Sequence, residues 1–426
     1  MFEYKKNKLD FILLTFFSIY PLAIVFGNFA INMCFLIIGT IFFYKLVKKE
    51  TFFYEYKNSF FLLLFFFISL LINLAFSNDI YLSHQRVIKF FFIIFFIISF
   101  KYLIINFSKN LEIIYKLWSI FFLIVIIDVL IEFFVGKNIL GQSVMMPGRV
   151  GSFTGEEKVI GHFFFGFCLI FLSFLYPRLK NYGFSLILAS SLIIISFIIG
   201  ERANFIRTFL AISLFVFFAY RINYKIKIFS VILIVITSYL IFSFSDNYYK
   251  ARYFDQVKLI FTPNGLTKYL DDSKYGGHRN AAKEIFLDNP IFGVGIKNFR
   301  IESRNKKYHT FPGETPPNLD TTKSNPEKHW KHMLGANHPH ELYYEFLSET
   351  GIFGFSCFLI FILSSIIFSI KNYLKEKNIY QLSGIIVVMI SILPVIPIGS
   401  FFATYTSSIF WINYAIMMGY NYNKKN

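Results

Sequence analysis

Charged residues are scarce in this sequence. Asp, Glu, Lys and Arg together make up 16% of the 426 residues, whereas hydrophobic residues make up 56% and phenylalanine alone occurs 60 times. A water-soluble protein of this length would lack the polar side chains needed to cover its surface. The composition therefore excludes a soluble domain and indicates that lipid surrounds most of the chain.

Cysteine is also scarce, and none of it has metal-binding spacing. Cys34, Cys168 and Cys357 all lie inside apolar segments, which indicates small buried side chains. No small-residue cleavage site appears before Phe26, so we interpret the first apolar segment as a retained span and not as a signal peptide. The formal net charge of +17 is carried mainly between apolar segments, so no nucleic-acid partner is expected.

About twelve apolar segments are long enough to cross a bilayer as helices, which requires roughly 17 to 25 residues. The sequence therefore predicts an all-α integral membrane protein with about 12 transmembrane helices, forming one polytopic domain over residues 1–426. The approximate spans are residues 11–27, 29–47, 59–76, 87–107, 115–135, 159–176, 184–200, 203–220, 226–244, 352–370, 379–396 and 400–418.

The distribution of Lys and Arg predicts which side each loop faces. Every second connection is basic, as at Lys45 and Lys48 or at Arg221 and Lys225, and such connections remain in the cytoplasm during insertion. Both termini are therefore expected in the cytoplasm. Two long loops, residues 136–158 and 245–350, are expected on the opposite, outer side, because long translocated segments are exempt from this charge rule.

The larger loop, residues 245–350, separates the ninth and tenth spans and is expected to be partly helical. Residues 248–261 and 279–287 have apolar residues at helical spacing, and Asn289-Pro290 would end the second of these helices. Residues 306–328 contain four prolines, which predicts an irregular segment or a lid.

Arginines near the outer ends of spans are candidates for binding phosphate. Arg202 lies in a tight connection between two spans, and Arg207 lies farther into the second of them. Ionised groups at such depth are costly and usually pair or line a polar cavity, and a guanidinium matches phosphate oxygens. The alternative for Arg202 is an anchor that reaches toward water. Arg149, in the shorter loop, faces either phosphate or water.

Two carboxylates also lie in an apolar helix. Asp128 and Glu132 are four residues apart and so share one helix face near the outer end of the fifth span. We expect them to form a structural ion pair with Arg86, Lys89 or one of the arginines above. The alternative is a role in an acceptor or base site.

Histidines gather just before the tenth span. A histidine side chain can take a proton from a hydroxyl nucleophile near neutral pH, so His340 is the candidate general base. His338 precedes it by two residues. A zinc site with His329 and His332 is the alternative, but no cysteine or fixed scaffold supports it. The protease pattern HExxH is excluded because Tyr344 stands at the position of its second histidine.

The pattern around His340 resembles the signature of the O-antigen ligase and polymerase superfamily. That signature is a histidine, a small polar residue, nine residues, a glycine, two residues and a small or aromatic residue; here it comprises His340, Glu341, Gly351 and Gly354. Glu341 departs from it. Residues 279–286 and 289–299 are similar to the family's loop helix and the segment after it, and Arg202 resembles its arginine at the start of a span.

This resemblance implies an inverting, metal-independent glycosyltransferase without cofactor, in the bacterial inner membrane, with its active site on the periplasmic face. It implies a glycan donor on undecaprenyl pyrophosphate and an acceptor that is lipid A-core or another glycan, surrounded by membrane lipid. Fixed cations would stabilise the leaving pyrophosphate while a base deprotonates the acceptor. Arg202, Arg279 and Arg207 are assigned to the pyrophosphate and His340 to the acceptor hydroxyl, with Arg149 and His338 as further binding residues.

Several functions stay open at this stage. The sequence does not separate a ligase, which attaches glycan to lipid A-core, from a polymerase of repeat units, although residues 151–157 resemble polymerase loops. Transfer to protein is a third possibility. A polysaccharide transporter or flippase would also suit twelve spans with buried charges, but the sequence shows no duplicated halves.

Overall fold

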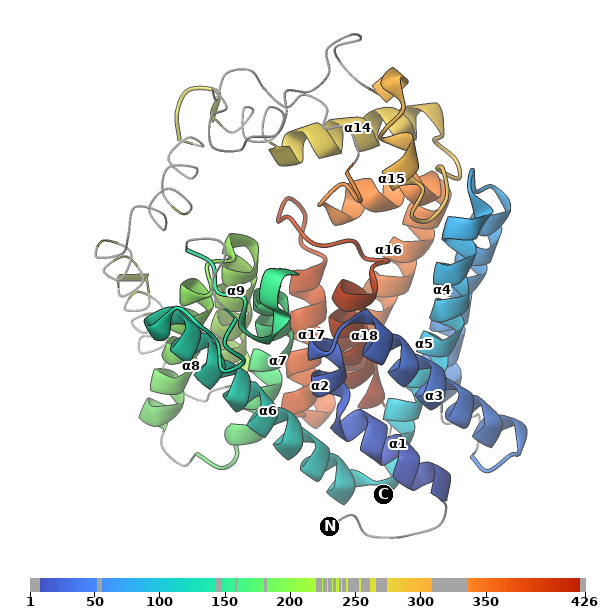
Figure 1. The fold of residues 1–426 in the computed structure, drawn as a ribbon. Helices are drawn as coiled ribbons and strands as arrows, with labels where there is room; N and C mark the ends of the chain where they lie inside the picture. The colour runs from blue at the N-terminus through green and yellow to red at the C-terminus, as the bar shows by residue number, and fades with distance from the viewer. Residues whose placement is uncertain are drawn as a thin grey trace.

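The computed structural model describes residues 8–51, 56–142, 148–157, 159–179, 182–219, 261–265, 274–308 and 336–421, together with isolated positions between residues 224 and 253. Within these ranges the regular elements are helices, and no strand occurs among them (Figure 1). The predicted all-helical fold is therefore confirmed for the part of the chain that the structure describes.

The helices follow the predicted spans closely. Before the larger loop they are α1 (Lys8–Ser18), α2 (Tyr20–Val25), α3 (Asn28–Val47), α4 (Lys57–Ala75), α5 (Ile80–Asn106), α6 (Ser108–Val135), η2 (Ser152–Glu157), α7 (Ile160–Leu175), α8 (Tyr182–Ile198) and α9 (Arg202–Ala219). Within and after that loop they are α14 (Lys274–Asp288), α15 (Phe299–Glu302), η5 (Lys306–Tyr308), α16 (Leu342–Glu376), α17 (Ile379–Ser391) and α18 (Thr404–Gly419).

Six helices are long and apolar enough to cross a membrane, namely α3, α4, α5, α6, α9 and α16. Helices α7, α8 and α17 are apolar but shorter. These lengths confirm a multi-pass membrane protein. The count of twelve spans stays a prediction, because the expected ninth span, residues 226–244, lies mostly outside the described residues.

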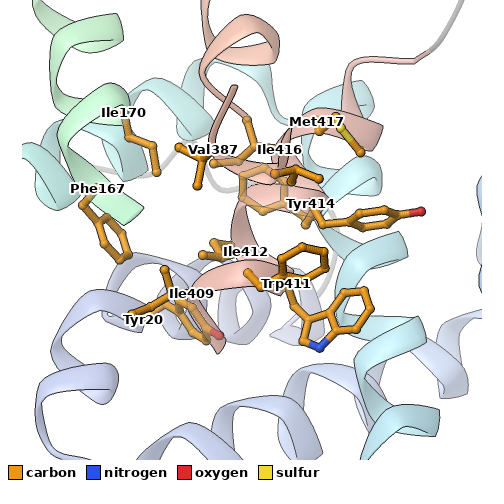
Figure 2. Close-up of a cluster of buried hydrophobic side chains, with 14 of the residues drawn as sticks. Tyr20, Phe167, Ile170, Val387, Ile409, Trp411, Ile412, Tyr414, Ile416 and Met417 are labelled. Carbon is orange, nitrogen blue, oxygen red and sulfur yellow. The ribbon is translucent and has the colours of Figure 1, made fainter. Parts of the chain in front are cut away.

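Helix α18 forms the centre of the bundle and packs against α3, α5, α7 and α17. Figure 2 shows Trp411, Ile412 and Tyr414 of α18 among side chains from other helices, including Tyr20 and Phe167. Polar bonds add to this packing: the Tyr20 hydroxyl donates to the Ser408 carbonyl (3.1 Å). Since lipid is as apolar as these side chains, close packing and such hydrogen bonds hold the helices together.

The segment after α14 docks onto a break in α16. Gly351, inside α16, has φ +63° and interrupts the regular helix, so backbone groups around it need other partners. Residues 290–295 supply them. Four backbone hydrogen bonds join the two segments: Val294 N to Ser348 O (3.0 Å), Gly295 N to Glu349 O (2.9 Å), Ile352 N to Pro290 O (2.8 Å) and Phe353 N to Ile291 O (3.1 Å).

Two asparagines fasten the same segment to α4 and α5. The Asn73 side chain donates to the carbonyl oxygens of Phe292 (2.7 Å) and Glu349 (3.1 Å). Asn298 accepts from the Asp79 amide (3.1 Å) and donates to the Ser83 hydroxyl. Figure 1 shows α14 and α15 at the end of the bundle opposite to both chain termini.

Several predicted boundaries differ from the structure. The first span is divided into α1 and α2, with Pro21 in the first turn of α2, where its missing N–H costs no helical bond. Helix α14 begins at Lys274 and not at residue 279. Helix α17 ends at Ser391, before Pro394 and Pro397, where residues up to 396 were expected to continue the span. The expected lid and the helix at 248–261 lie almost entirely outside the described residues.

Replacing Gly351 with alanine should destabilise the protein strongly, because the new Cβ would overlap the Ile291 carbonyl oxygen. Gly136→Ala is a matched control: Gly136 also has positive φ (+80°), but nothing lies within 4 Å of its Cβ position. The control should cost about 1 kcal/mol for the left-handed conformation, and Gly351→Ala about 2 kcal/mol more from the overlap. Thermal melting of both variants in detergent measures the difference, and equal melting temperatures would contradict the docked arrangement.

Candidate active site

Three histidines meet near the beginning of α16. The ring centroids of His338 and His340 are 3.9 Å apart, and the His278 ring, from α14, lies 5.2 Å from His340. The ring centroid of Tyr275, also on α14, lies 5.3 Å from that of His340. His340 has φ +59°, a conformation that few non-glycine residues adopt. Helix α14 and the residues before α16 together hold the candidate base.

Glu341, the residue that departs from the family pattern, begins α16. Its side chain accepts a hydrogen bond from the Tyr344 amide (3.0 Å), as an N-cap residue does. Burial raises the pKa of Glu341, while the positive charge of Arg279 acts in the opposite direction. Arg279 is itself buried on α14, at 8% exposure. The carboxylate thus caps the helix in place of a small polar side chain and lies in the electrostatic field of Arg279.

His338 is an uncharged neighbour of His340 at neutral pH. Burial lowers its pKa far below the ordinary value, and the nearby His340, Lys297 and His278 lower it further. Its Nε2 atom is buried and has no hydrogen-bond partner among the described residues. A neutral imidazole therefore lies directly beside the candidate base.

The connection between α17 and α18, residues 392–403, holds the histidine segment in place. The Ile398 amide donates to the His340 carbonyl (3.0 Å), and the Tyr343 hydroxyl donates to the Ile392 carbonyl (2.7 Å). Arg207 binds the same connection from α9. Its Nη2 donates to the carbonyl oxygens of Ile396 and Pro397, both at 2.9 Å. Arg207 is 1% exposed, so this arginine reaches His340 through the backbone of residues 396–398.

Arg149 joins a second polar group around Glu201. The Glu201 carboxylate accepts from the Gly161 amide (2.8 Å) and the Asn204 side chain (2.6 Å), and Arg149 lies 3.6 Å from it. Asn204 in turn accepts from Arg207 (3.3 Å). Burial raises the pKa of Glu201, and the charge of Arg149 opposes that rise. Arg149 and Arg207 are thus linked through Glu201 and Asn204.

The prediction that Asp128 and Glu132 form an ion pair with a nearby Arg or Lys is wrong. Asp128 accepts from the Ile139 amide (2.7 Å) and the Ser152 hydroxyl, whereas Glu132 accepts from the Gly151 amide (3.0 Å) and the Ser152 amide. Both carboxylates hold the shorter loop against α6. The amides of that loop donate to them, so the carboxylates are satisfied without a cation. The loop so held carries Arg149, two residues before Gly151.

A further buried group was not recognised in the sequence. The Lys297 amide donates to Glu349 (2.8 Å), the Phe401 amide donates to Glu345 (2.8 Å), and the Ser400 hydroxyl links the Lys297 ammonium to Glu345. The only available signal was the spacing of Glu345 and Glu349, four residues apart on α16. This group joins the docked segment, α16 and the connection before α18.

The structure brings most of the predicted site residues to one end of the bundle. His338 and His340 are in contact, Arg279 lies near Glu341, and Arg149 and Arg207 share one polar group. Arg202 is half-buried and forms the first residue of α9. Among the described residues no cluster of His, Cys, Asp and Glu has an arrangement that would hold a metal; His329 and His332 of the zinc alternative lie outside them.

Comparison with known families places this site in a recognised domain. The model of the O-antigen ligase family matches residues 184–359. This range contains Arg202, Arg207, Arg279, His338 and His340. A search of curated proteins found no significant match. Members of the matched family are glycosyltransferase-like enzymes of O-antigen and polysaccharide assembly. Residues 184–359 of this membrane protein thus form the part of the chain that matches the O-antigen ligase family, and this match supports the O-antigen ligase and polymerase superfamily.

Proposed function

We propose that the protein transfers a glycan from undecaprenyl pyrophosphate to a sugar hydroxyl at the periplasmic face of the bacterial inner membrane, as an O-antigen ligase. The observation that carries this proposal is the position of His340 between α14, which bears Arg279, and residues 396–398, which Arg207 holds. An imidazole held next to segments that carry fixed cations suits a reaction that removes a proton and releases a diphosphate.

His340 takes the proton from the acceptor hydroxyl. The deprotonated oxygen attacks the anomeric carbon of the donor sugar. The bond from that carbon to the diphosphate oxygen breaks, and its electron pair leaves with the diphosphate. The configuration at the anomeric carbon is thereby inverted. The neutral His338 adds no positive charge beside His340. His338 therefore does not oppose the positive charge that His340 gains when it takes the proton.

Arg279 and Arg202 bind the leaving diphosphate. Arg279 is buried next to His278, whose ring contacts His340, so its charge acts in surroundings of low polarity. Arg202 is the first residue of α9, where the positive end of the helix dipole also favours an anion. Arg207 has a different role: because its Nη2 is bound to two carbonyls, it positions the histidine segment.

His340→Ala should lower the rate of glycan transfer by about 10²- to 10⁴-fold, the usual contribution of a general base. His84→Ala is the control, since the contacts of His84 among the described residues are with Ile80 and Tyr81 of its own helix. Surface glycan in a host without its own enzyme, and protein in isolated membranes, measure activity and insertion separately. Normal glycan in the His340 variant would rule out this residue as the base.

Arg279 and Arg207 should differ in their kinetic effects. Arg279→Gln removes a diphosphate contact and should weaken donor binding at least tenfold. Arg207→Gln loses the bonds to Ile396 and Pro397 and should lower kcat with little change in donor affinity, because His340 is displaced. Donor titration and single-turnover rates on purified protein separate the two effects. Equal losses of donor affinity would assign Arg207 to substrate binding.

Repeat-unit polymerisation is the second candidate function, favoured by the similarity of residues 151–157 to polymerase loops. Mass analysis of lipid-linked glycan in a strain lacking the protein distinguishes the two. A ligase should leave full-length polymer on the carrier lipid, because only the final transfer is blocked. Accumulation of single repeat units would instead identify a polymerase, and unchanged carrier-linked glycan would contradict both.

A further inference from the structure

Arg86 and Lys89 form a pair of cations that makes no ion pair among the described residues. They lie three residues apart on α5, and both donate to the Thr404 hydroxyl, at 3.5 Å and 3.2 Å. The Thr404 hydroxyl in turn donates a hydrogen bond to the Asn32 side-chain oxygen (3.4 Å). Both cations are half-buried, and no carboxylate lies within ion-pair distance of either among the described residues. Half-buried cations whose remaining donors face no anion are costly.

Two more cations approach from the docked segment. Lys297 is 7% exposed and donates to the Ser400 hydroxyl, and Arg300 donates to Asn337 (3.0 Å), the neighbour of His338. Burial lowers the pKa of Lys297, the charges of Glu345 and Glu349 oppose this change, and the charges of Arg86 and Arg300 add to it, so all of these groups lie close enough to interact. Glu345 and Glu349 are the nearby carboxylates, and their bonds go to the Ser400 hydroxyl and to backbone amides. Positive charge therefore exceeds negative charge here.

Apolar side chains adjoin the cation pair. Arg86 and Lys89 line one hollow between α4, α5 and α18, together with Leu70, Phe90, Ile93, Phe401, Phe402, Ser407 and Trp411. A free inorganic ion would make no favourable contact with the apolar side chains of this hollow. A phosphate attached to a hydrocarbon anchor would satisfy the cations and the apolar surface together.

We propose that Arg86, Lys89 and Lys297 bind the phosphate group of a second lipid-anchored substrate, the acceptor. This inference rests on the proposed transferase function, because a transferase must hold donor and acceptor at once. The donor diphosphate is assigned, in the proposed function, to Arg202 and Arg279. The acceptor is thereby assigned to the class of phosphorylated, membrane-anchored glycans.

The distance to the base is compatible with this role. The Ile398 amide binds the His340 carbonyl, and Thr404, which binds Lys89, follows six residues later. Six residues span at most about 22 Å when fully extended. The head group held by Arg86 and Lys89 is therefore close enough for its attached sugars to reach His340.

Titration of the purified full-length protein in phosphatidylcholine nanodiscs with farnesyl diphosphate tests the proposal. We expect two binding sites. Arg86→Gln combined with Lys89→Met should weaken one site at least tenfold, and Arg279→Gln should weaken the other. Lys283→Met is the matched control, because Lys283 is exposed on α14 at the same end of the bundle, and it should leave both sites unchanged. Melting curves establish that each variant is folded.

A single site in the unmodified protein would overturn the proposal, as would two unchanged sites in the Arg86/Lys89 variant. Inorganic pyrophosphate distinguishes the source of the phosphate: it should bind the Lys89-dependent site at least tenfold more weakly than farnesyl diphosphate, and equal affinity would overturn the assignment to an anchored substrate. The outcome is separate from that of the proposed reaction. Transfer by His340→Ala would remove the catalytic assignment but leave the two-site titration unaffected.

Discussion

The backbone pairing between residues 290–295 and the break in α16 is the constraint on which the rest of the site depends. In apolar surroundings an interrupted helix cannot leave its amides and carbonyls without partners. Gly351 makes the interruption, and the docked segment satisfies it. This pairing places Lys297 beside Glu349, and it brings α14, directly before the segment, over the first turn of α16. His338 and His340, which lie outside the regular helices, are therefore held against α14, which carries His278.

Most cations at this end of the bundle are held by neutral groups. Arg207 binds two carbonyl oxygens, and Arg86 and Lys89 share one hydroxyl. Arg149, beside Glu201, and Lys307, beside Asp288, are instead paired with carboxylates. Neutral partners satisfy the geometry of a cation without cancelling its charge, so the positive potential remains for an anion. The carboxylates Asp128 and Glu132, by contrast, accept hydrogen bonds from loop amides and have a structural role.

Much of the architecture could be predicted because its signals are local. The apolar segment at 29–47 matches α3 closely, and the segment at 115–135 lies within α6, which begins at Ser108, since length and composition alone favour a helix in lipid. Predictions failed where a distant partner decides the outcome. Helix α17 stops at Ser391, and the prolines that follow lie in a connection bound by Arg207 and Tyr343. Glu341 looked like a departure from the family pattern, yet its longer side chain still reaches the amide that a cap must bind.

The sequence by itself determined the class of protein, the positions of most helices, and His340, Arg202 and Arg279 as the candidate site residues of a recognisable family. Only the tertiary structure decided what each charged side chain contacts. Asp128 meets Ser152, Arg207 meets Pro397, and Lys89 meets Thr404, pairs separated by 24, 190 and 315 residues. Helical periodicity relates residues three or four positions apart. It carries no information about partners that meet only after the helices have packed.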